Sequence, residues 1–301
     1  MTITRVEKLI YGVEDMDTGA NYYRDWGVDE VETGPERTVF KTRTNQFIEL
    51  RPADDPSLPG SPDPAKSTLR RAIWGVADAA GLKEMGADLA SDRDVQEDAD
   101  GTLCFADESG NGLGLAVATP VKTDVEIIPH NVNTTEPRMN AVISPAAQAN
   151  PIRIGHVVYM IEMADREKAV SFYLDRLRFR LSDSTKTGGD FMRCEGGHDH
   201  HNLFLISRAD RNAFDHASFE VENFDMVMMG GLYVKQKGWE QDTMPGRHIL
   251  GSNYYWYFNN PCGGRTEYFA DMDRMDDSWE PRIWDESPGF SLWSLDDASM
   301  A

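Results

Sequence analysis

The sequence predicts an α+β fold of two domains, each made of a pair of βαβββ modules. The 301 residues suit about two domains of roughly 150 residues each. In both halves the order of one strand, one helix and several short strands occurs twice, and such self-similarity indicates a repeat architecture. A segment rich in proline, asparagine and threonine separates the halves. The expected boundaries are 1–120 for the N-terminal domain, 121–150 for the linker, 151–273 for the C-terminal domain and 274–301 for a tail.

The first half opens with a strand-like apolar run at residues 6–15, followed by a helical pattern at residues 16–27. Two short alternating strands follow at residues 39–44 and 47–52. The order then begins again at residues 69–90 with a second strand and helix. We therefore expect two modules in the N-terminal domain.

The second half has the same organisation. A β-branched strand at residues 152–162 precedes a helix at residues 164–179, and short strands follow at residues 190–195 and 202–207. The helix has an apolar face, because apolar residues recur at helical spacing. These are Ala169, Phe172, Tyr173 and Leu177. The segment 214–238 opens the fourth module.

Composition and charge exclude some functions. The chain is 40% hydrophobic and 27% charged, which is ordinary for a soluble globular protein. A formal net charge of −21 disfavours nucleic acid and anionic membrane surfaces as partners, since both require lysine or arginine to neutralise phosphate. No run of about 18 apolar residues is present, so no membrane span is expected. We expect a small-molecule substrate instead.

Cysteine usage indicates the compartment. Cys104, Cys194 and Cys262 are few, odd in number and far apart, which favours a reducing environment over a disulfide framework. The N-terminal residues lack the apolar segment of a secretory signal. We therefore expect a cytoplasmic protein.

Histidines concentrate in the second half, where six of the seven occur. His156 lies in the first strand of the third module and His216 at the equivalent place in the fourth, while Glu267 lies in the last strand among apolar neighbours. A lone strand histidine is usually a satisfied core residue, and a strand glutamate often lies at an edge. If the two modules pair into one curved sheet, however, all three converge on its concave face. Two imidazoles and one carboxylate then form the facial set that leaves open positions on Fe(II).

Several segments together resemble the vicinal oxygen chelate superfamily, and more closely its type I extradiol catechol dioxygenases. The resemblance covers nearly the whole chain and is densest from Ile152 to Asp271. The segments that carry it are IRIGHVVYMIE, HHNLFLI, FDHASFEVENFD, GRHILGSNYYWYF and GGRTEYFAD. It implies three metal ligands, one acid–base residue and two residues over the catechol oxygens. The implied metal ligands are His156, His216 and Glu267. The implied acid–base residue is His201, and the two residues over the catechol oxygens are His248 and Tyr257.

The implied activity is extradiol cleavage of a catecholic substrate, with both atoms of O2 inserted. The implied cofactor is Fe(II), and Mn(II) accepts the same ligands. A homo-oligomer is also expected. Two alternatives remain: a non-redox isomerase or lyase of the same superfamily, and a protein that only binds an aromatic compound. The intact set of three ligands argues against the second.

The tract at 198–201 contains three histidines, and short tracts of this kind can bind metals. His200 and His201 are adjacent, so on a strand their side chains would point to opposite faces and could not easily share one ion. We expect His201 to point into the site and His198 and His200 to be loop residues without a role. His200 as the inward residue is the alternative.

The equivalent positions of the first half hold Lys8, Arg71 and Gly114, which are not a usable ligand set. The N-terminal domain is therefore expected to be structural. Family members that cleave homoprotocatechuate grip its carboxylate with an arginine where this chain has Thr243, although Arg247 or Arg282 could substitute.

The tail contains Trp279, Trp284 and Trp293, which are costly to leave in water. We therefore expect it to fold back over a domain surface. Trp284 is a candidate lid over the site, and a simple packing role is the alternative.

Overall fold

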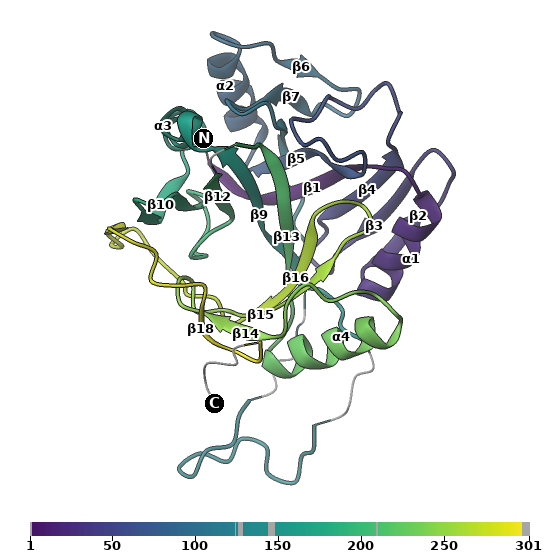
Figure 1. Ribbon diagram of the computed structural model, residues 1–301, viewed down its shortest axis with the longest axis vertical. Coiled ribbons are helices and arrows are strands. Elements are labelled where there is room, and N and C mark those ends of the chain that lie inside the picture. Colours follow the sequence, from purple (N-terminus) through teal and green to yellow (C-terminus); the bar gives the residue numbers. More distant parts are fainter. Residues whose placement is uncertain (1, 124, 126–128, 144–147, 209, 297–301) are drawn as a thin grey trace.

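Four consecutive βαβββ modules make up the chain, two in each half, as the repeated element order predicted. The structure, a computed structural model, describes all of residues 1–301 except 1, 124, 126–128, 144–147, 209 and 297–301 (Figure 1). The first module consists of β1 Ile3–Val13, α1 Met16–Trp26, β2 Asp29–Glu32, β3 Thr38–Lys41 and β4 Phe47–Pro52. The second consists of β5 Thr68–Val76, α2 Ala79–Leu89, β6 Gln96–Glu97, β7 Leu103–Ala106 and β8 Gly112–Val117.

The second half repeats this order and adds two tail strands. The third module consists of β9 Arg153–Glu162, η1 Met163–Asp165, α3 Arg166–Ser171, η2 Phe172–Arg176, β10 Arg180–Thr185, β11 Gly189–Arg193 and β12 Leu203–Arg208. The fourth consists of β13 Ala213–Glu220, α4 Phe224–Gln236, β14 Gly246–His248, β15 Tyr254–Asn259 and β16 Arg265–Ala270, and the tail holds β17 Arg282–Trp284 and β18 Ser291–Ser294. The predicted helix at 164–179 therefore ends in a π-helical turn. Its predicted apolar face is buried.

Each half forms one sheet in which the first strands of its two modules pair antiparallel. β1 pairs with β5 in a sheet of order β2-β3-β4-β1-β5-β8-β7-β6. β9 pairs with β13 in a sheet of order β17-β10-β11-β12-β9-β13-β16-β15-β14-β18. Figure 1 shows the second sheet bending from β10 and β12, through β9, β13 and β16, to β15 and β14. Because residues alternate between the faces of a strand, this bend gives the C-terminal sheet a concave face on which every second residue is available.

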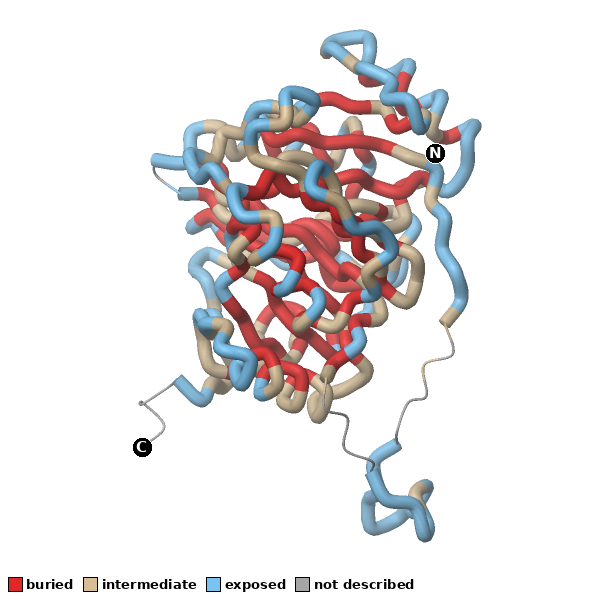
Figure 2. The backbone as a smooth tube through the Cα atoms, turned by 90° about the vertical axis from the view of Figure 1, so that its right-hand side faces the viewer, coloured by how far each residue is buried: buried red, intermediate tan, exposed pale blue. Residues whose placement is uncertain are grey.

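The two halves share one core, shown as the buried centre in Figure 2. Trp26 at the end of α1 stacks on Tyr268 of β16, with ring centroids 3.7 Å apart and planes 7° apart. Buried Gln46 donates to the carbonyls of Val6 in β1 and Ile154 in β9 and accepts from the Ile154 amide. A buried amide that is satisfied from both sheets fixes one half against the other.

The tail folds back on the C-terminal sheet at both edges. β17 pairs parallel with β10, and β18 pairs antiparallel with β14. The indole of Trp279 donates to the Ser182 carbonyl, and Trp293 packs against Tyr254 and Phe224. These contacts bury part of each ring and give the acidic tail a fixed course.

The segment expected to be the linker lies partly outside the described residues, at 124, 126–128 and 144–147, and so does the end of the tail at 297–301. Its last part contacts the N-terminal half, since the side-chain amide of Gln148 donates to the carbonyl of Arg24. Cys104, Cys194 and Cys262 are all buried and free. No helix within the described residues is long and apolar enough to cross a membrane.

Candidate active site

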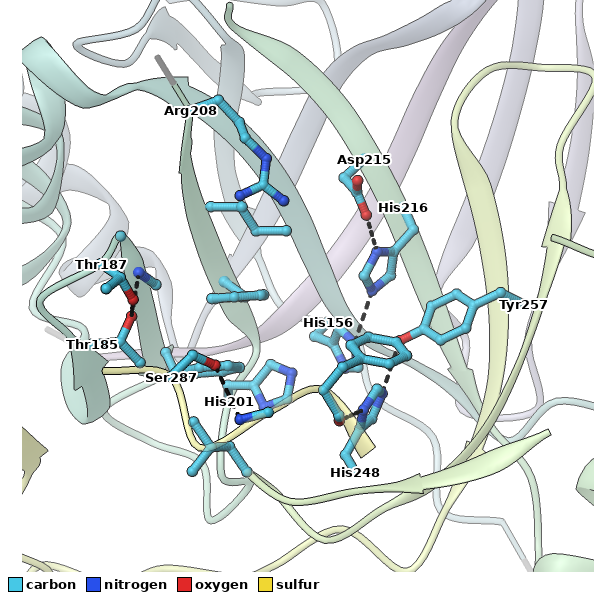
Figure 3. Close-up of a pocket in the computed structure, with 18 of the residues that line it drawn as sticks. His156, Thr185, Thr187, His201, Arg208, Asp215, His216, His248, Tyr257 and Ser287 are labelled. Atoms are coloured by element: carbon cyan, nitrogen blue, oxygen red, sulfur yellow. Dashed lines mark hydrogen bonds and ion pairs between the residues drawn. The ribbon is translucent and has the colours of Figure 1, made fainter. Parts of the chain in front are cut away.

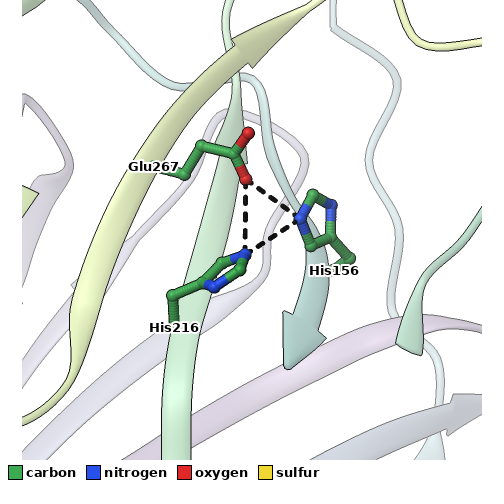
Figure 4. Close-up of side chains that lie close together, drawn as sticks. All are labelled: His156, His216 and Glu267. Atoms are coloured by element: carbon green, nitrogen blue, oxygen red, sulfur yellow. Dashed lines mark hydrogen bonds and ion pairs between the residues drawn. The ribbon is translucent and has the colours of Figure 1, made fainter. Parts of the chain in front are cut away.

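The three residues expected to hold a metal come from the central strands β9, β13 and β16, and their side chains meet (Figure 4). Nε2 of His156 lies 3.0 Å from Oε2 of Glu267 and 3.4 Å from Nε2 of His216. Nε2 of His216 lies 3.5 Å from the same carboxylate oxygen. Strand register explains the convergence: Ser218 of β13 is opposite both His156 and Glu267, and His216 precedes it by two residues on the same face.

This arrangement fits a divalent cation. All three side chains are buried, and Oε2 of Glu267 accepts no hydrogen bond from the described residues although two ring nitrogens lie near it. The three donor atoms therefore present their lone pairs toward a common point. Neighbouring ligand atoms around a six-coordinate divalent ion are about 3 Å apart, close to the distances seen here. The site fits a mononuclear non-haem metal, bound on one face and open on the other.

Electrostatics keep Glu267 and His156 in metal-binding form. Burial raises the pKa of Glu267, but the electrostatic attraction of His156 and the nearness of the His216 and His248 ring nitrogens outweigh it and hold the pKa well below its usual range. The side chain is therefore a carboxylate. Burial lowers the pKa of His156, which keeps this imidazole neutral and its nitrogen free to donate a lone pair.

Asp215 orients the second histidine. Its Oδ1 lies 2.5 Å from Nδ1 of His216, and Arg265 forms an ion pair with the same carboxylate. Burial lowers the pKa of His216, but the hydrogen bond to Asp215 and the interaction with Glu267 raise it by more. A carboxylate that accepts the Nδ1 proton fixes the tautomer in which Nε2 faces the metal. Sequence reasoning missed Asp215, although its place next to His216 is a readable signal.

A cavity of about 400 Å³ opens beside the three residues (Figure 3). Its polar lining next to the candidate metal centre consists of His201, His248 and Tyr257. Its apolar lining consists of Phe191, Phe204, Ile206, Leu250 and Phe290. This combination of apolar walls and few polar groups is typical of a small-molecule site.

His201 lines this cavity, as expected, and its ring centroid lies 4.2 Å from that of His156. His200, expected to be a loop residue without a role, does precede β12, but its ring makes two close contacts. Nδ1 of His200 lies 2.9 Å from Nδ1 of His201, and its Nε2 lies 2.7 Å from Oδ2 of Asp183. The alternation argument failed because β12 begins only at Leu203, so both histidines precede the strand. His198 lies outside this group and contacts the carbonyl of Met275.

Asp183 anchors the chain of histidines and also binds the tail. Its carboxylate accepts hydrogen bonds from the guanidinium of Arg282 and from the indole of Trp284. Burial raises the pKa of Asp183, but hydrogen bonds from His200, Arg282 and Trp284 outweigh it and lower the pKa. Asp183 therefore remains a carboxylate that accepts from Nε2 of His200. No local pattern in the sequence marks this residue.

His248 and Tyr257 form a pair beside the candidate metal centre. Nε2 of His248 lies 2.9 Å from the Tyr257 hydroxyl and 3.6 Å from Oε1 of Glu267. Burial and the nearby charge of Glu267 raise the pKa of Tyr257 well above its usual value, so its hydroxyl stays protonated. The Tyr257 hydroxyl can therefore donate a hydrogen bond, either to Nε2 of His248 or to an oxygen bound near the metal position. Because side chains alternate along β15, neighbouring Trp256 and Phe258 face the core.

Three residues considered for the substrate end do not line the cavity. Arg247 binds Asp271, and Arg282 binds Asp183, and neither lines the cavity. Trp284 does not line it either. The tail instead contributes Ser287, Gly289 and Phe290, and the ring of Phe290 lies 4.7 Å from that of His248.

The corresponding positions of the N-terminal half hold no comparable group. Lys8 forms an ion pair with Asp100, and Arg71 forms one with Asp98. The third position, Gly114, has no side chain to offer as a ligand. These contacts agree with a structural function for this half.

The family model of the Glyoxalase/Bleomycin resistance protein/Dioxygenase superfamily matches residues 153–268. Among curated proteins, the chain is 36% identical to Metapyrocatechase 2 of Cupriavidus necator over 132 residues, which are 44% of this chain and 40% of that protein. It thus spans less than half of this relative's length. It is 28% identical to Biphenyl-2,3-diol 1,2-dioxygenase of Paraburkholderia xenovorans (strain LB400), covering 72% of this chain and 75% of the relative. It is also 28% identical to the Iron-dependent extradiol dioxygenase of Rhodococcus jostii (strain RHA1), covering 72% and 70%.

Solved structures show the same fold. The Mn(II)-bound glyoxalase from Novosphingobium aromaticivorans superimposes with a TM-score of 0.75 at 21% identity, covering 98% of this chain and 91% of that one. The 2,3-dioxygenase LapB from Pseudomonas sp. KL28 superimposes with a TM-score of 0.73 at 20% identity, covering 95% and 98%. The chain therefore shares the two-domain architecture of these proteins along nearly its whole length.

Proposed function

We propose that this protein is an extradiol ring-cleaving dioxygenase that inserts both atoms of O2 into a catecholic substrate, and the match of residues 153–268 to the model of the Glyoxalase/Bleomycin resistance protein/Dioxygenase superfamily supports this. One observation carries the proposal. An acid–base candidate, His201, and a hydrogen-bonding pair, His248 and Tyr257, line the same cavity as the histidines of the candidate metal centre. A site that used the metal only as a Lewis acid would not need an acid–base residue such as His201 beside it.

The proposed metal is Fe(II), held by His156, His216 and Glu267, and Mn(II) is the alternative that the same ligands accept. When bound, the metal lowers the pKa of a catechol hydroxyl and holds both substrates on one centre. Two imidazoles and one carboxylate are the facial donor set of non-haem Fe(II) oxygenases. The iron dependence in the name of the Rhodococcus jostii relative supports this choice.

In this proposal, His201 moves a proton at its Nε2. Burial and the nearby His156 and His200 hold the pKa of His201 well below its usual value, so the ring is neutral and can accept a proton. If Nε2 of His200 donates to Asp183, then Nδ1 of His200 accepts from Nδ1 of His201. Nε2 of His201 is then the unprotonated nitrogen, and it takes the proton of a catechol hydroxyl and later returns it. Asp183 and His200 act as positioning residues.

His248 and Tyr257 hold the substrate oxygens in the proposed reaction. The Tyr257 hydroxyl stays protonated because of its raised pKa, so it can donate to an oxygen that gains negative charge. His248 is fixed from three sides, since its Nδ1 lies 3.0 Å from the Phe290 carbonyl, its Nε2 contacts Tyr257 and its ring stacks on Tyr255. A hydroxyl beside such a fixed ring can stabilise developing charge without reorganising during the reaction.

Oxygen uptake by the protein tests the proposal. The protein is freed of metal, loaded anaerobically with Fe(II) or with Mn(II), and mixed with a panel of substituted catechols in an oxygen electrode. We expect one O2 consumed per catechol and the yellow colour of a ring-opened semialdehyde. Catechol binding without O2 uptake under either metal would overturn the dioxygenase proposal. Isomerase or lyase activity without O2 uptake would favour a non-redox member of the superfamily.

A further inference from the structure

The cavity is longer than a catechol ring requires, and its far end is cationic. Its floor along β12 is formed by alternate residues Phe204, Ile206 and Arg208, while Leu203, Leu205 and Ser207 are buried behind them. A strand rises about 3.4 Å per residue, so Phe204 and Arg208 are separated by about 13 Å along this floor. His201 precedes the same strand beside the candidate metal centre. One strand therefore lines a path from the proposed reaction centre to an arginine.

The middle of this path is apolar. The rings of Phe191 and Phe204 stack with centroids 3.9 Å apart and planes 6° apart, and Ile206 continues the surface toward Arg208. Gly189, opposite Ile206 on β11, leaves room there because it has no side chain. This stretch can contact an apolar spacer or a second ring, but it offers no side-chain hydrogen-bond donor.

Arg208 is the cation at the far end. Figure 3 shows its guanidinium directed into the cavity from the end of its strand. Within the described residues, Arg208 forms no side-chain hydrogen bond and no ion pair, not even with Glu162, its neighbour across the strand pair. The cavity's other arginine, Arg265, is neutralised by Asp215 and Asp242. Arg208 is thus the charge in this lining that remains available to a ligand.

Two threonine hydroxyls also belong to the cavity lining. Thr185 and Thr187 both line it, and the Thr187 hydroxyl lies 3.3 Å from that of Thr185. The guanidinium fork of Arg208 matches the planar, two-oxygen geometry of a carboxylate. The apolar stretch separates the Arg208 end of the cavity from the donors that face the metal position.

We infer that the substrate is an elongated catechol whose ring lies at the metal centre and whose side chain carries a carboxylate or similar anion to Arg208. This inference rests on the proposed dioxygenase function and specifies its substrate class. Arg208 is the specificity-determining residue, and Phe191, Phe204 and Ile206 contact the spacer. Neither Arg247 nor Arg282 takes this part, because both are paired with other carboxylates.

Matched acid and ester substrates test this inference. The probes are 2,3-dihydroxyphenyl alkanoates of increasing chain length, their methyl esters and unsubstituted catechol. For the chain length that fits, we expect the wild-type KM for the acid to be about tenfold or more below that for its ester, as a charge-assisted hydrogen bond implies. The Arg208→Met variant should raise KM for the acid to the value for the ester, with kcat unchanged. Arg208→Lys should recover part of the difference, because it keeps the charge without the fork.

Controls separate this inference from the proposed function. Arg24→Met removes the same charge from α1, far from the cavity, and should leave every KM unchanged. Equal KM values for acid and ester in the wild type, or an equal rise for both in Arg208→Met, would overturn the inference. Acid binding is also measured by calorimetry on the metal-loaded protein without O2. If no probe is cleaved but acids bind tenfold more weakly to Arg208→Met, the dioxygenase proposal fails and the anion site stands.

Discussion

Nδ1 of His200 faces Nδ1 of His201 at 2.9 Å, so two adjacent histidines share one proton between them. A proton shared in this way ties the tautomer of one ring to that of the other. Because the far side of His200 is bound to Asp183, the carboxylate selects which nitrogen of His201 faces the cavity. Asp183 in turn receives Arg282 and Trp284 from the tail. The position of the proposed acid–base residue thus depends on a segment some eighty residues further along the chain.

The first prediction concerns this chain. His201→Gln should lower kcat by about 10²- to 10⁴-fold, the usual contribution of a general acid–base group. His200→Phe should lower kcat by about tenfold or more, because His201 loses the acceptor that selects its tautomer. Oxygen uptake under saturating catechol measures both, with bound metal determined in the same samples. His198→Ala is the matched control from the same tract and should keep wild-type kcat, since its ring bonds the Met275 carbonyl and does not line the cavity. A wild-type kcat in His200→Phe would contradict the positioning role.

The second prediction concerns metal affinity. Asp215→Asn should weaken metal binding by about 10- to 100-fold, because Asp215 fixes the Nδ1 proton of His216. Competition with a fluorescent chelator measures the dissociation constant. Asp242→Asn is the control, since Asp242 also binds Arg265 but does not contact His216. Equal affinities in the two variants would show that the effect comes from Arg265 instead.

The third prediction concerns stability against pH. Buried Asp199 is bound by Arg153, Arg274 and Asn202. Burial raises its pKa, but the charge and hydrogen bonds of Arg153 outweigh this and lower it. A carboxyl group whose pKa is lower in the folded state stabilises the fold above its unfolded pKa of about 3.9, and this stabilisation is lost as pH falls through the folded pKa.

Asp199→Asn should therefore lower the free energy of unfolding by about 3 kcal/mol at neutral pH, the lower end for breaking a buried pair. The difference from wild type should shrink as pH falls below about 4. Urea denaturation at a series of pH values measures this. Exposed Asp277, which pairs with Arg180, serves as the control, and Asp277→Asn should change stability by less than about 1 kcal/mol. A pH-independent difference for Asp199→Asn would contradict the assignment.

The fourth prediction concerns the tail. Phe290 lines the cavity and packs edge-on against His248 with ring centroids 4.7 Å apart. Phe290→Ala should raise KM for catechols about two- to tenfold, as expected for one lost aromatic contact, with a smaller effect on kcat. Leu292→Ala, an exposed residue of the same tail that does not line the cavity, should leave KM unchanged. Equal KM values for Phe290→Ala and wild type would leave the tail with only a packing function.

Patterns within single segments were enough to predict the fold. Period-two and helical spacing predicted the four modules, and the repeat predicted that His156 and His216 occupy equivalent strands. Both are local properties of the chain, because side-chain direction in a strand or helix follows from backbone geometry alone. The same reasoning failed at His200, where the backbone is not yet a strand and alternation does not apply.

The sequence by itself determined which residue types lie on which strands: two histidines and a glutamate on β9, β13 and β16. Only the tertiary structure decided that Asp183 receives His200 and the tail, and that Arg208, rather than Arg247 or Arg282, reaches the cavity. The physical reason is that these contacts join segments far apart in the chain. Their geometry depends on sheet curvature and on how the tail packs, and no local periodicity encodes either.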